Sequence, residues 1–175
     1  MTPPPGYLST IAILAIRNDA TVRLDEVTGP FDAEAKRRLA DRLAAMDPWH
    51  RYGFTSERLV RFLSAPAPDA RRLLMVDGER HAGIAVVRAG WLAGSYLNFL
   101  AVMPEDQGRG MGEAFLAWLA DEGRRLGERN QFVAASAFNA PALAFYERHG
   151  FTRVAVLPGL ISDAETEFLL RRRLA

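Results

Sequence analysis

The chain has 175 residues, of which 49% are hydrophobic and 25% charged, and its 22 basic side chains nearly balance 21 acidic ones. This length and apolar content fit one globular domain and exclude a disordered chain. A formal net charge of +1 gives no reason to expect nonspecific binding to nucleic acid. The chain has no cysteine and three scattered histidines, so we expect no thiolate nucleophile, disulfide or metal site.

The N-terminal stretch resembles neither a signal peptide nor a membrane span. Residues 1–6 carry three prolines and no basic side chain, and the apolar stretch 7–16 is far shorter than the roughly 20 residues that a span needs. We therefore expect a cytoplasmic protein without a membrane partner. Residues 1–20 are expected to be an N-terminal extension, partly disordered or forming an extra strand or helix. It could also contact a second subunit in a homodimer. Residues 21–175 are expected to form one domain.

The first half of the chain predicts strands and two helices. Asp32 is a typical N-cap, and apolar residues behind it recur at helical spacing until Asp47–Pro48. A second helix is predicted after Thr55 or Ser56, and Gly29–Pro30 should end the first strand. The predicted strands cover residues 22–27, 73–76, 83–87 and 96–102.

The second half alternates between helices and strands. One helix is predicted from about residue 112 to 126, and a second from Asn139 to His149, where Gly150 provides a stop signal. The predicted strands cover residues 132–136, 151–157 and 167–174. The order of elements predicts a mixed α/β (α+β) domain with a mainly antiparallel first half and a central β-α-β crossover.

A glycine-rich turn lies between a predicted buried strand and a helix. From Val102 to Gly112 the sequence reads VMPEDQGRGMG, which would direct backbone N–H groups and a helix N-terminus toward one point, as a pyrophosphate requires. The dinucleotide fingerprint is excluded because Glu113 replaces its third glycine, and no Lys-Ser or Lys-Thr pair completes a nucleotide-binding P-loop. A plain glycine-rich turn is the alternative.

A second motif follows at residues 139–151. It has the pattern N-x-x-A-x-x-x-Y-x-x-x-G-F, in which Asn139 can cap a helix and Gly150 can end it. Tyr146 lies between them. Taken with Gln107-x-x-Gly110-x-Gly112, this motif resembles the signature of the GNAT superfamily of N-acetyltransferases. The resemblance extends over about residues 73–174.

This resemblance implies a fold, a co-substrate and a reaction. The fold would be a mixed, mostly antiparallel sheet of about six to seven strands flanked by about four helices. Acetyl-CoA would give its acetyl group directly to an amine of a small molecule or peptide, without a metal, and Tyr146 would protonate the leaving thiolate. The residues implied to contact the coenzyme are Leu100, Ala101, Val102, Gln107, Gly108, Arg109, Gly110, Met111, Gly112, Asn139 and Tyr146. As alternatives, Asn139 could act only as a helix cap and Tyr146 only as a core residue.

The sequence offers no evident general base. Tyr96 stands where some family members carry a glutamate, and neither Asn98 nor the strand 132–136 contains a carboxylate. Glu105 and Asp106 are expected to face solvent. A water chain, a residue of the first half or the free-amine fraction of the substrate could serve instead. The missing carboxylate also leaves open an acyl-CoA-binding module without catalysis, and a further alternative is a transferase for a longer acyl-CoA.

Two loops are expected to form the acceptor site. The first loop, residues 47–54, could form a recognition surface with His50 as a base. We favour the alternative that Trp49 and Phe54 anchor the loop to the core and that His50 is solvated. The second loop covers residues 158–166, where Asp163 and Glu165 could attract a cationic amine. Beyond it, the arginines at 171–173 are interpreted as a solvated strand edge.

Overall fold

The computed structural model describes residues 8–28 and 31–174. Its strands form one eight-stranded sheet of order β1-β2-β3-β4-β5-β6-β8-β7. The strands are β1 Leu8–Ala15, β2 Thr21–Val27, β3 Ala70–Asp77, β4 Arg80–Arg88, β5 Gly94–Val102, β6 Asn130–Ser136, β7 Thr152–Pro158 and β8 Thr166–Arg173. The α-helices are α1 Ala33–Ala44, α2 Ser56–Ser64, α3 Met111–Arg125 and α4 Ala140–Arg148.

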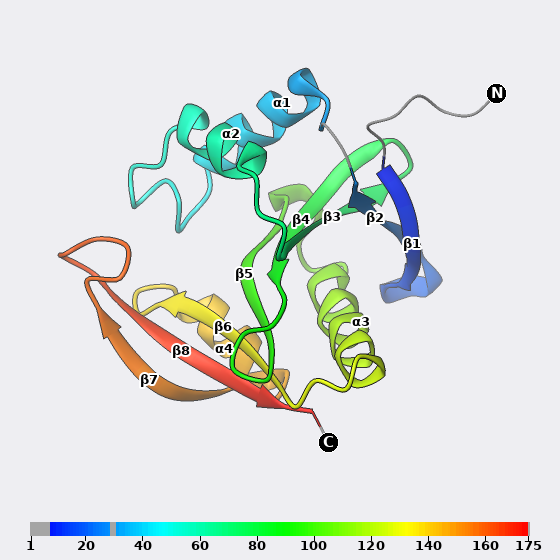
Figure 1. Cartoon of the computed structure of the whole chain (residues 1–175). Coiled ribbons are helices and arrows are strands. Elements are labelled where there is room, and N and C mark those ends of the chain that lie inside the picture. The colour runs from blue at the N-terminus through cyan, green and yellow to red at the C-terminus, as the bar shows by residue number, and fades with distance from the viewer. Residues whose placement is uncertain (1–7, 29–30, 175) are drawn as a thin grey trace.

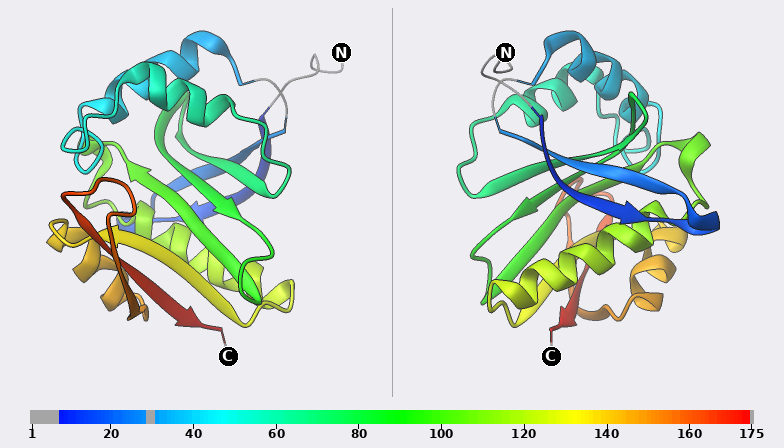
Figure 2. Two further views of the ribbon diagram at one scale, coloured as in Figure 1. Left: turned by 60° about the vertical axis from the view of Figure 1, so that its left-hand side comes forward. Right: turned by 90° about the vertical axis from the view of Figure 1, so that its right-hand side faces the viewer.

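The sheet separates two layers of helices. In Figures 1 and 2, α1 and α2 lie on one side of the strands, and α3 and α4 lie on the other. Side chains alternate between the two layers along a strand. In β3, Leu74 packs in the α1–α2 cluster, whereas Leu73 and Met75 pack with Phe115 of α3. The core is therefore divided in two by the sheet.

The predicted α/β class is confirmed, with one strand more than the upper estimate of seven. The additional strand is β1, which pairs antiparallel with β2 and uses the apolar stretch of the N-terminal extension. The proline run at 1–6 and the break at Gly29–Pro30 lie outside the described residues.

Three helices begin where the sequence predicts. Asp32 accepts a hydrogen bond from the amide of Ala35 at 2.7 Å, and Thr55 accepts one from the amide of Arg58 at 3.2 Å. Asn139 caps α4 by accepting from the amide of Ala142 at 3.2 Å. These local caps are readable from sequence because each involves residues three positions apart.

The prediction of a solvated edge at residues 171–173 is wrong. The hairpin of β7 and β8 returns β8 to the interior of the sheet, where it pairs with both β6 and β7. The guanidinium of Arg172 donates to the side chain of Gln131 at 2.6 Å and to the carbonyl of Leu116 at 2.8 Å. Burial lowers the pKa of Arg172 to about 10.

The central strands β5 and β6 pair over only a short length. Their parallel register begins at Gly94 and Asn130 and ends at Leu97 and Val133. Beyond this point β5 runs on to Val102 and β6 to Ser136 without pairing to each other. A register shift in the β4–β5 pairing lies at the same level, where a β-bulge bends the strand. The two strands therefore diverge, and the site lies in the opening.

Within the two described ranges, we find no helix of the length and apolar character needed to cross a bilayer.

Candidate active site

The turn from Gln107 to Gly112, called here the glycine turn, joins β5 to α3. Gly108 and Gly110 have φ values of 76° and 87°, a left-handed conformation that favours glycine. Gly110 occupies the N-cap of α3, and the first amide bonded within the helix is that of Ala114, which donates to the Gly110 carbonyl. The amides of the first turn before it are free for a ligand such as a phosphate.

Asp106 anchors the glycine turn from below. We expected it to face solvent, but it is 1% exposed because two arginines cover it. Arg80 donates to both of its carboxylate oxygens, at 2.8 and 2.9 Å, and Arg109 donates to it at 2.7 Å. The hydrogen bond from Arg80 is the main reason why the pKa of Asp106 lies below its ordinary value, and Arg109 lowers it further.

The side chain of Arg109 helps to hold Asp106 in place. Its Nη1 also donates to Asp77 at 2.7 Å, so two carboxylates hold the guanidinium. Gln107 folds back in a similar way, since its Nε2 donates to the carbonyl of Val102 at 3.0 Å. These contacts fix the path of the backbone and leave its amides as the binding groups of the turn.

Arg17 supports the glycine turn from the opposite side, although the sequence does not indicate it. It lies between β1 and β2, and its amide donates to the carbonyl of Arg109 at 3.0 Å. Its Nη1 donates to the carbonyl of Gly108 at 3.1 Å, and its Nη2 lies 3.7 Å from Glu113. Its side chain is 64% exposed and adds a positive charge beside the turn.

A first cavity of about 690 Å³ lies between the glycine turn, the end of β5, and α4. Arg17 lines it, as do all the residues predicted to contact the coenzyme except Arg109, whose side chain is held by Asp77 and Asp106. Gly112 brings α3 close to α4, because an added Cβ would lie 3.0 Å from the ring of Phe145.

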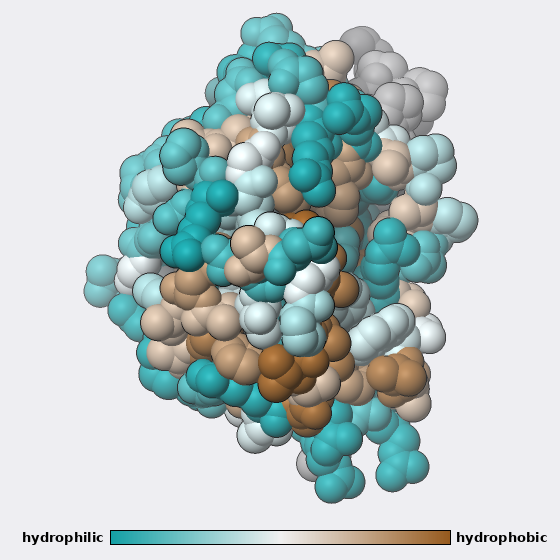
Figure 3. Space-filling model, turned by 90° about the vertical axis from the view of Figure 1, so that its left-hand side faces the viewer, coloured by the Kyte–Doolittle hydropathy of each residue, from teal (hydrophilic) through white to brown (hydrophobic). Residues whose placement is uncertain are grey.

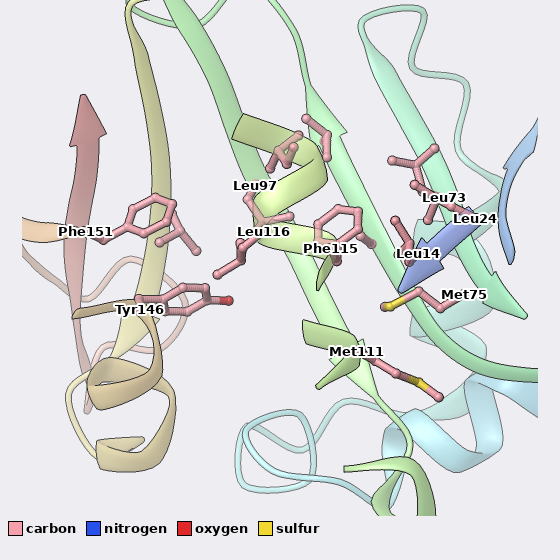
Figure 4. Close-up of a cluster of buried hydrophobic side chains, with 14 of the residues drawn as sticks. Leu14, Leu24, Leu73, Met75, Leu97, Met111, Phe115, Leu116, Tyr146 and Phe151 are labelled. Carbon is pink, nitrogen blue, oxygen red and sulfur yellow. The ribbon is translucent and has the colours of Figure 1, made fainter. Parts of the chain in front are cut away.

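A second cavity of about 360 Å³ adjoins the first, in the opening between β5 and β6. Six residues line both cavities: Pro48, Trp49, Leu100, Asn139, Ala142 and Tyr146. Tyr146 therefore stands at their junction, and Figure 4 shows its hydroxyl turned from α4 toward the β5 side of the sheet. Burial raises the pKa of Tyr146 well above its ordinary value, so the phenol stays protonated at neutral and moderately alkaline pH.

The walls of the second cavity are mainly apolar. Trp49 stacks on Phe99 of β5 with 4.3 Å between ring centroids, which confirms that it anchors the loop 47–54, and His50 is exposed as expected. Leu160 and Ile161 line the cavity from the loop after β7, with 54% and 44% exposure. Figure 3 faces this side of the molecule, where hydrophobic surface gathers in the lower half below more hydrophilic helices.

A buried carboxylate, Glu167, also lines the second cavity. It is 1% exposed, and its Oε1 accepts a hydrogen bond from the hydroxyl of Tyr52. The hydroxyl of Ser136 lies 2.8 Å from the same phenol oxygen and donates to it. Burial, and then the hydrogen bond to Glu167, raise the pKa of Tyr52 to about 12. Glu167 is not among the predicted site residues, because it lies outside the two central strands, on β8 opposite Ser136 of β6.

The expected role of Glu165 as a free carboxylate is wrong. Its Oε1 accepts from the guanidinium of Arg51 at 2.9 and 3.1 Å, which joins the two acceptor loops. Arg51 also lies over the ring of Phe138, 4.0 Å from its centroid. Asp163 is exposed. Among the described residues, no group of three or more His, Asp or Glu side chains is arranged to hold a metal ion.

Comparison with known proteins places the chain in a family. The model of the acetyltransferase (GNAT) family matches residues 36–151, and the chain belongs to that family. An acetyltransferase of Agrobacterium fabrum is 28% identical over 143 residues, covering 81% of this chain and 93% of the relative. The ribosomal protein bS18-alanine N-acetyltransferase of Escherichia coli is 28% identical over 109 residues, covering 62% of this chain and 68% of the relative.

Solved structures share the fold. A GNAT-family protein from Desulfovibrio desulfuricans superposes with a TM-score of 0.70 and 26% identity, over 88% of this chain and 99% of its own. A GNAT-family acetyltransferase from Elizabethkingia anophelis gives a TM-score of 0.66 at 15% identity, over 87% of this chain and 98% of its own. The predicted GNAT fold is thus confirmed, and the protein belongs to a family of acetyltransferases.

The glycine turn gives a first prediction. Gly110→Ala adds a Cβ at positive φ, 3.1 Å from Cγ of Arg17, and should move the turn amides. We expect acetyl-CoA affinity, measured by calorimetry, to fall roughly tenfold, which corresponds to about 1.4 kcal/mol. Gly127→Ala is the control, because Gly127 has φ of +74° with open space around it. Both variants should lose about 1 kcal/mol of unfolding free energy, and equal coenzyme affinity in the two would contradict the assignment.

The Asp106 anchor gives a pH-dependent prediction. Its pKa in the folded protein is lower than the value of about 3.9 in an unfolded chain, so the carboxylate stabilises the fold above about pH 4. This contribution is lost as the pH falls through the folded-state pKa. Asp106→Asn should lower the free energy of unfolding by about 1 to 3 kcal/mol at pH 7. Urea titrations should show a smaller difference from wild type at pH 3; a constant difference would refute the account.

Proposed function

We propose that this protein is an N-acetyltransferase that moves the acetyl group of acetyl-CoA directly to an amine of a small molecule or peptide. The observation that carries the proposal is the contact between the two cavities at Tyr146. A donor in the first cavity and an acceptor in the second would meet there, and holding reactants in contact is itself a large source of rate acceleration. The proposed setting is the cytoplasm, without a nucleic-acid or membrane partner, and a homodimer stays a prediction.

The first cavity fits a coenzyme A thioester. The glycine turn offers unpaired helix amides for a diphosphate, and Arg17 adds a cation beside them. Past Leu97, β5 has no partner on its β6 side, so Leu100, Ala101 and Val102 can present backbone groups to the pantetheine chain, with Asn139 opposite. The Elizabethkingia anophelis fold neighbour has acetyl-CoA bound. When bound, acetyl-CoA supplies an acetyl group already activated as a thioester.

Tyr146 is the proposed general acid. Its hydroxyl lies at the junction of the cavities and keeps its proton because burial disfavours the phenolate. A backbone N–H of the splayed part of β5 can polarise the acyl carbonyl in this buried environment. The chain needs no nucleophile of its own, which agrees with the absence of cysteine.

Activity is tested by thiol release from acetyl-CoA across a panel of amines. We expect release that depends on the amine, whereas coenzyme binding without release for any amine would favour an acyl-CoA-binding module. A preference for a longer thioester would instead indicate a different acyl donor.

Tyr146→Phe should lower kcat by roughly 100-fold, since a positioned acid contributes about 10²–10⁴-fold. The affinity for acetyl-CoA should not change, because the proton is needed only when sulfur leaves. The raised pKa of Tyr146 predicts the same loss from about pH 6 to pH 9. Unchanged turnover throughout this range would show that Tyr146 is not the acid.

Arg17→Ala should raise KM for acetyl-CoA about fivefold and leave kcat unchanged, since one phosphate contact contributes about 1 kcal/mol. Arg61→Ala is the control, because Arg61 is exposed on α2 and does not line the first cavity. Repeating the titration with 3′-dephospho-CoA identifies the phosphate involved. An equal KM in both variants would remove Arg17 from the coenzyme site.

A further inference from the structure

We propose that Glu167 binds the ammonium group of the acceptor and takes its proton, and that the acceptor is a compact primary monoamine on an apolar body. This inference rests on the proposed acetyl transfer and names its acceptor side.

The first observation is an unpartnered buried oxygen. Oε1 of Glu167 has the hydroxyl of Tyr52, but Oε2 has no hydrogen-bond partner among the residues that the structure describes. A carboxylate that is 1% exposed is unfavourable unless a cation or donor satisfies it. The ammonium group of a substrate in the second cavity would supply both the positive charge and the N–H donor.

The second observation is where Glu167 lies. It pairs across the sheet with Ser136, at the end of β6 that diverges from β5, and it lines the same cavity as Tyr146. Tyr96 interacts electrostatically with both groups. Burial raises the pKa of Tyr96 and the charge of Glu167 raises it further, while Tyr96 contributes to the raised pKa of Tyr146. The carboxylate of Glu167 and the phenol of Tyr146 therefore face the same cavity. Glu167 would contact the amine, and Tyr146 would contact the sulfur of the thioester.

The third observation concerns competing charges. In the described part of the chain, Glu167 is the one charged side chain that lines the second cavity. Glu165 is held by Arg51, and Asp163 is exposed. A single carboxylate suits one ammonium group and gives no second site for a polycationic acceptor.

The shape and lining of the second cavity define the rest of the acceptor. About 360 Å³ is near the lower limit of ligand sites, and the walls carry Trp49, Leu160 and Ile161. The ion pair between Arg51 and Glu165 joins the two loops beside it. These features favour a short alkyl or arylalkyl amine over a long polypeptide.

The proton steps balance. The ammonium gives one proton to Oε2 of Glu167, which later releases it to solvent. The freed lone pair forms the C–N bond with the acetyl carbonyl carbon, and the C–S bond breaks with its electron pair on sulfur. Tyr146 gives its proton to that sulfur and is reprotonated by the second proton that nitrogen loses. The products are the amide, the free thiol and one proton.

Two isosteric acceptors test the assignment. 2-Phenylethylamine is cationic at pH 7, whereas O-benzylhydroxylamine has nearly the same shape and is neutral. Glu167→Gln should lower kcat/KM about 100-fold for the first and at most about threefold for the second, because only the first must lose a proton before attack. Glu167→Asp should retain more activity with phenylethylamine than Glu167→Gln. Glu57→Gln is the matched control, because Glu57 is exposed on α2 and lines neither cavity, and it should change neither rate by more than about threefold.

Binding supplies a readout that does not require turnover. Calorimetry without acetyl-CoA should show that Glu167→Gln weakens binding of 2-phenylethylamine at least about tenfold, while the affinity for acetyl-CoA stays as in wild type. Equal effects of Glu167→Gln on the two acceptors, or no effect, would overturn the role of Glu167. Acetylation of peptides but of neither compact acceptor would overturn the substrate class. If the protein binds acetyl-CoA but none of the amines causes thiol release, the proposed transferase is refuted. The calorimetric titration with 2-phenylethylamine would then decide on Glu167 alone.

Discussion

The short parallel pairing of β5 and β6 is the constraint on which the site depends. After Leu97 and Val133 the two central strands diverge, and backbone groups that would bond across a sheet are left facing an opening. Helix α4 and the loop after α1 line this opening, and both cavities lie along it. A sheet paired to its full length would have no space for a thioester, and Tyr146 would be an ordinary core residue.

The arginines and carboxylates hold the site rather than forming a patch on the surface. Arg80 and Arg109 converge on Asp106 below the glycine turn, while Arg51 joins the acceptor loops through Glu165. In these pairs each positive charge is neutralised by a neighbouring negative one, which agrees with a net charge near zero. Of the charged side chains that line the two cavities, Arg17 lies beside the glycine turn and Glu167 lines the second cavity.

The features that could be predicted from the sequence are local ones. Helix caps such as Asn139, and the left-handed Gly110 before α3, depend on neighbours within four positions. Their pattern can therefore be recognised in the sequence alone. The features that were missed or wrong depend on contacts over long sequence distances. Arg17 contacts the carbonyl of Gly108, 91 positions away, and Asp106, in the turn after β5, is covered by Arg80 of β4. Glu167 reaches the acceptor side only because the last hairpin inserts β8 beside β6.

In the proposed reaction both substrates are bound together, and the acetyl group passes to the amine without an acetylated protein. Initial rates measured while acetyl-CoA and an accepted amine are varied against each other test this most directly. Direct transfer at the junction of the two cavities predicts double-reciprocal lines that intersect, with no acetyl group left on the protein after incubation with acetyl-CoA alone. Parallel lines, together with a stable acetylated protein in the mass spectrum, would contradict the account.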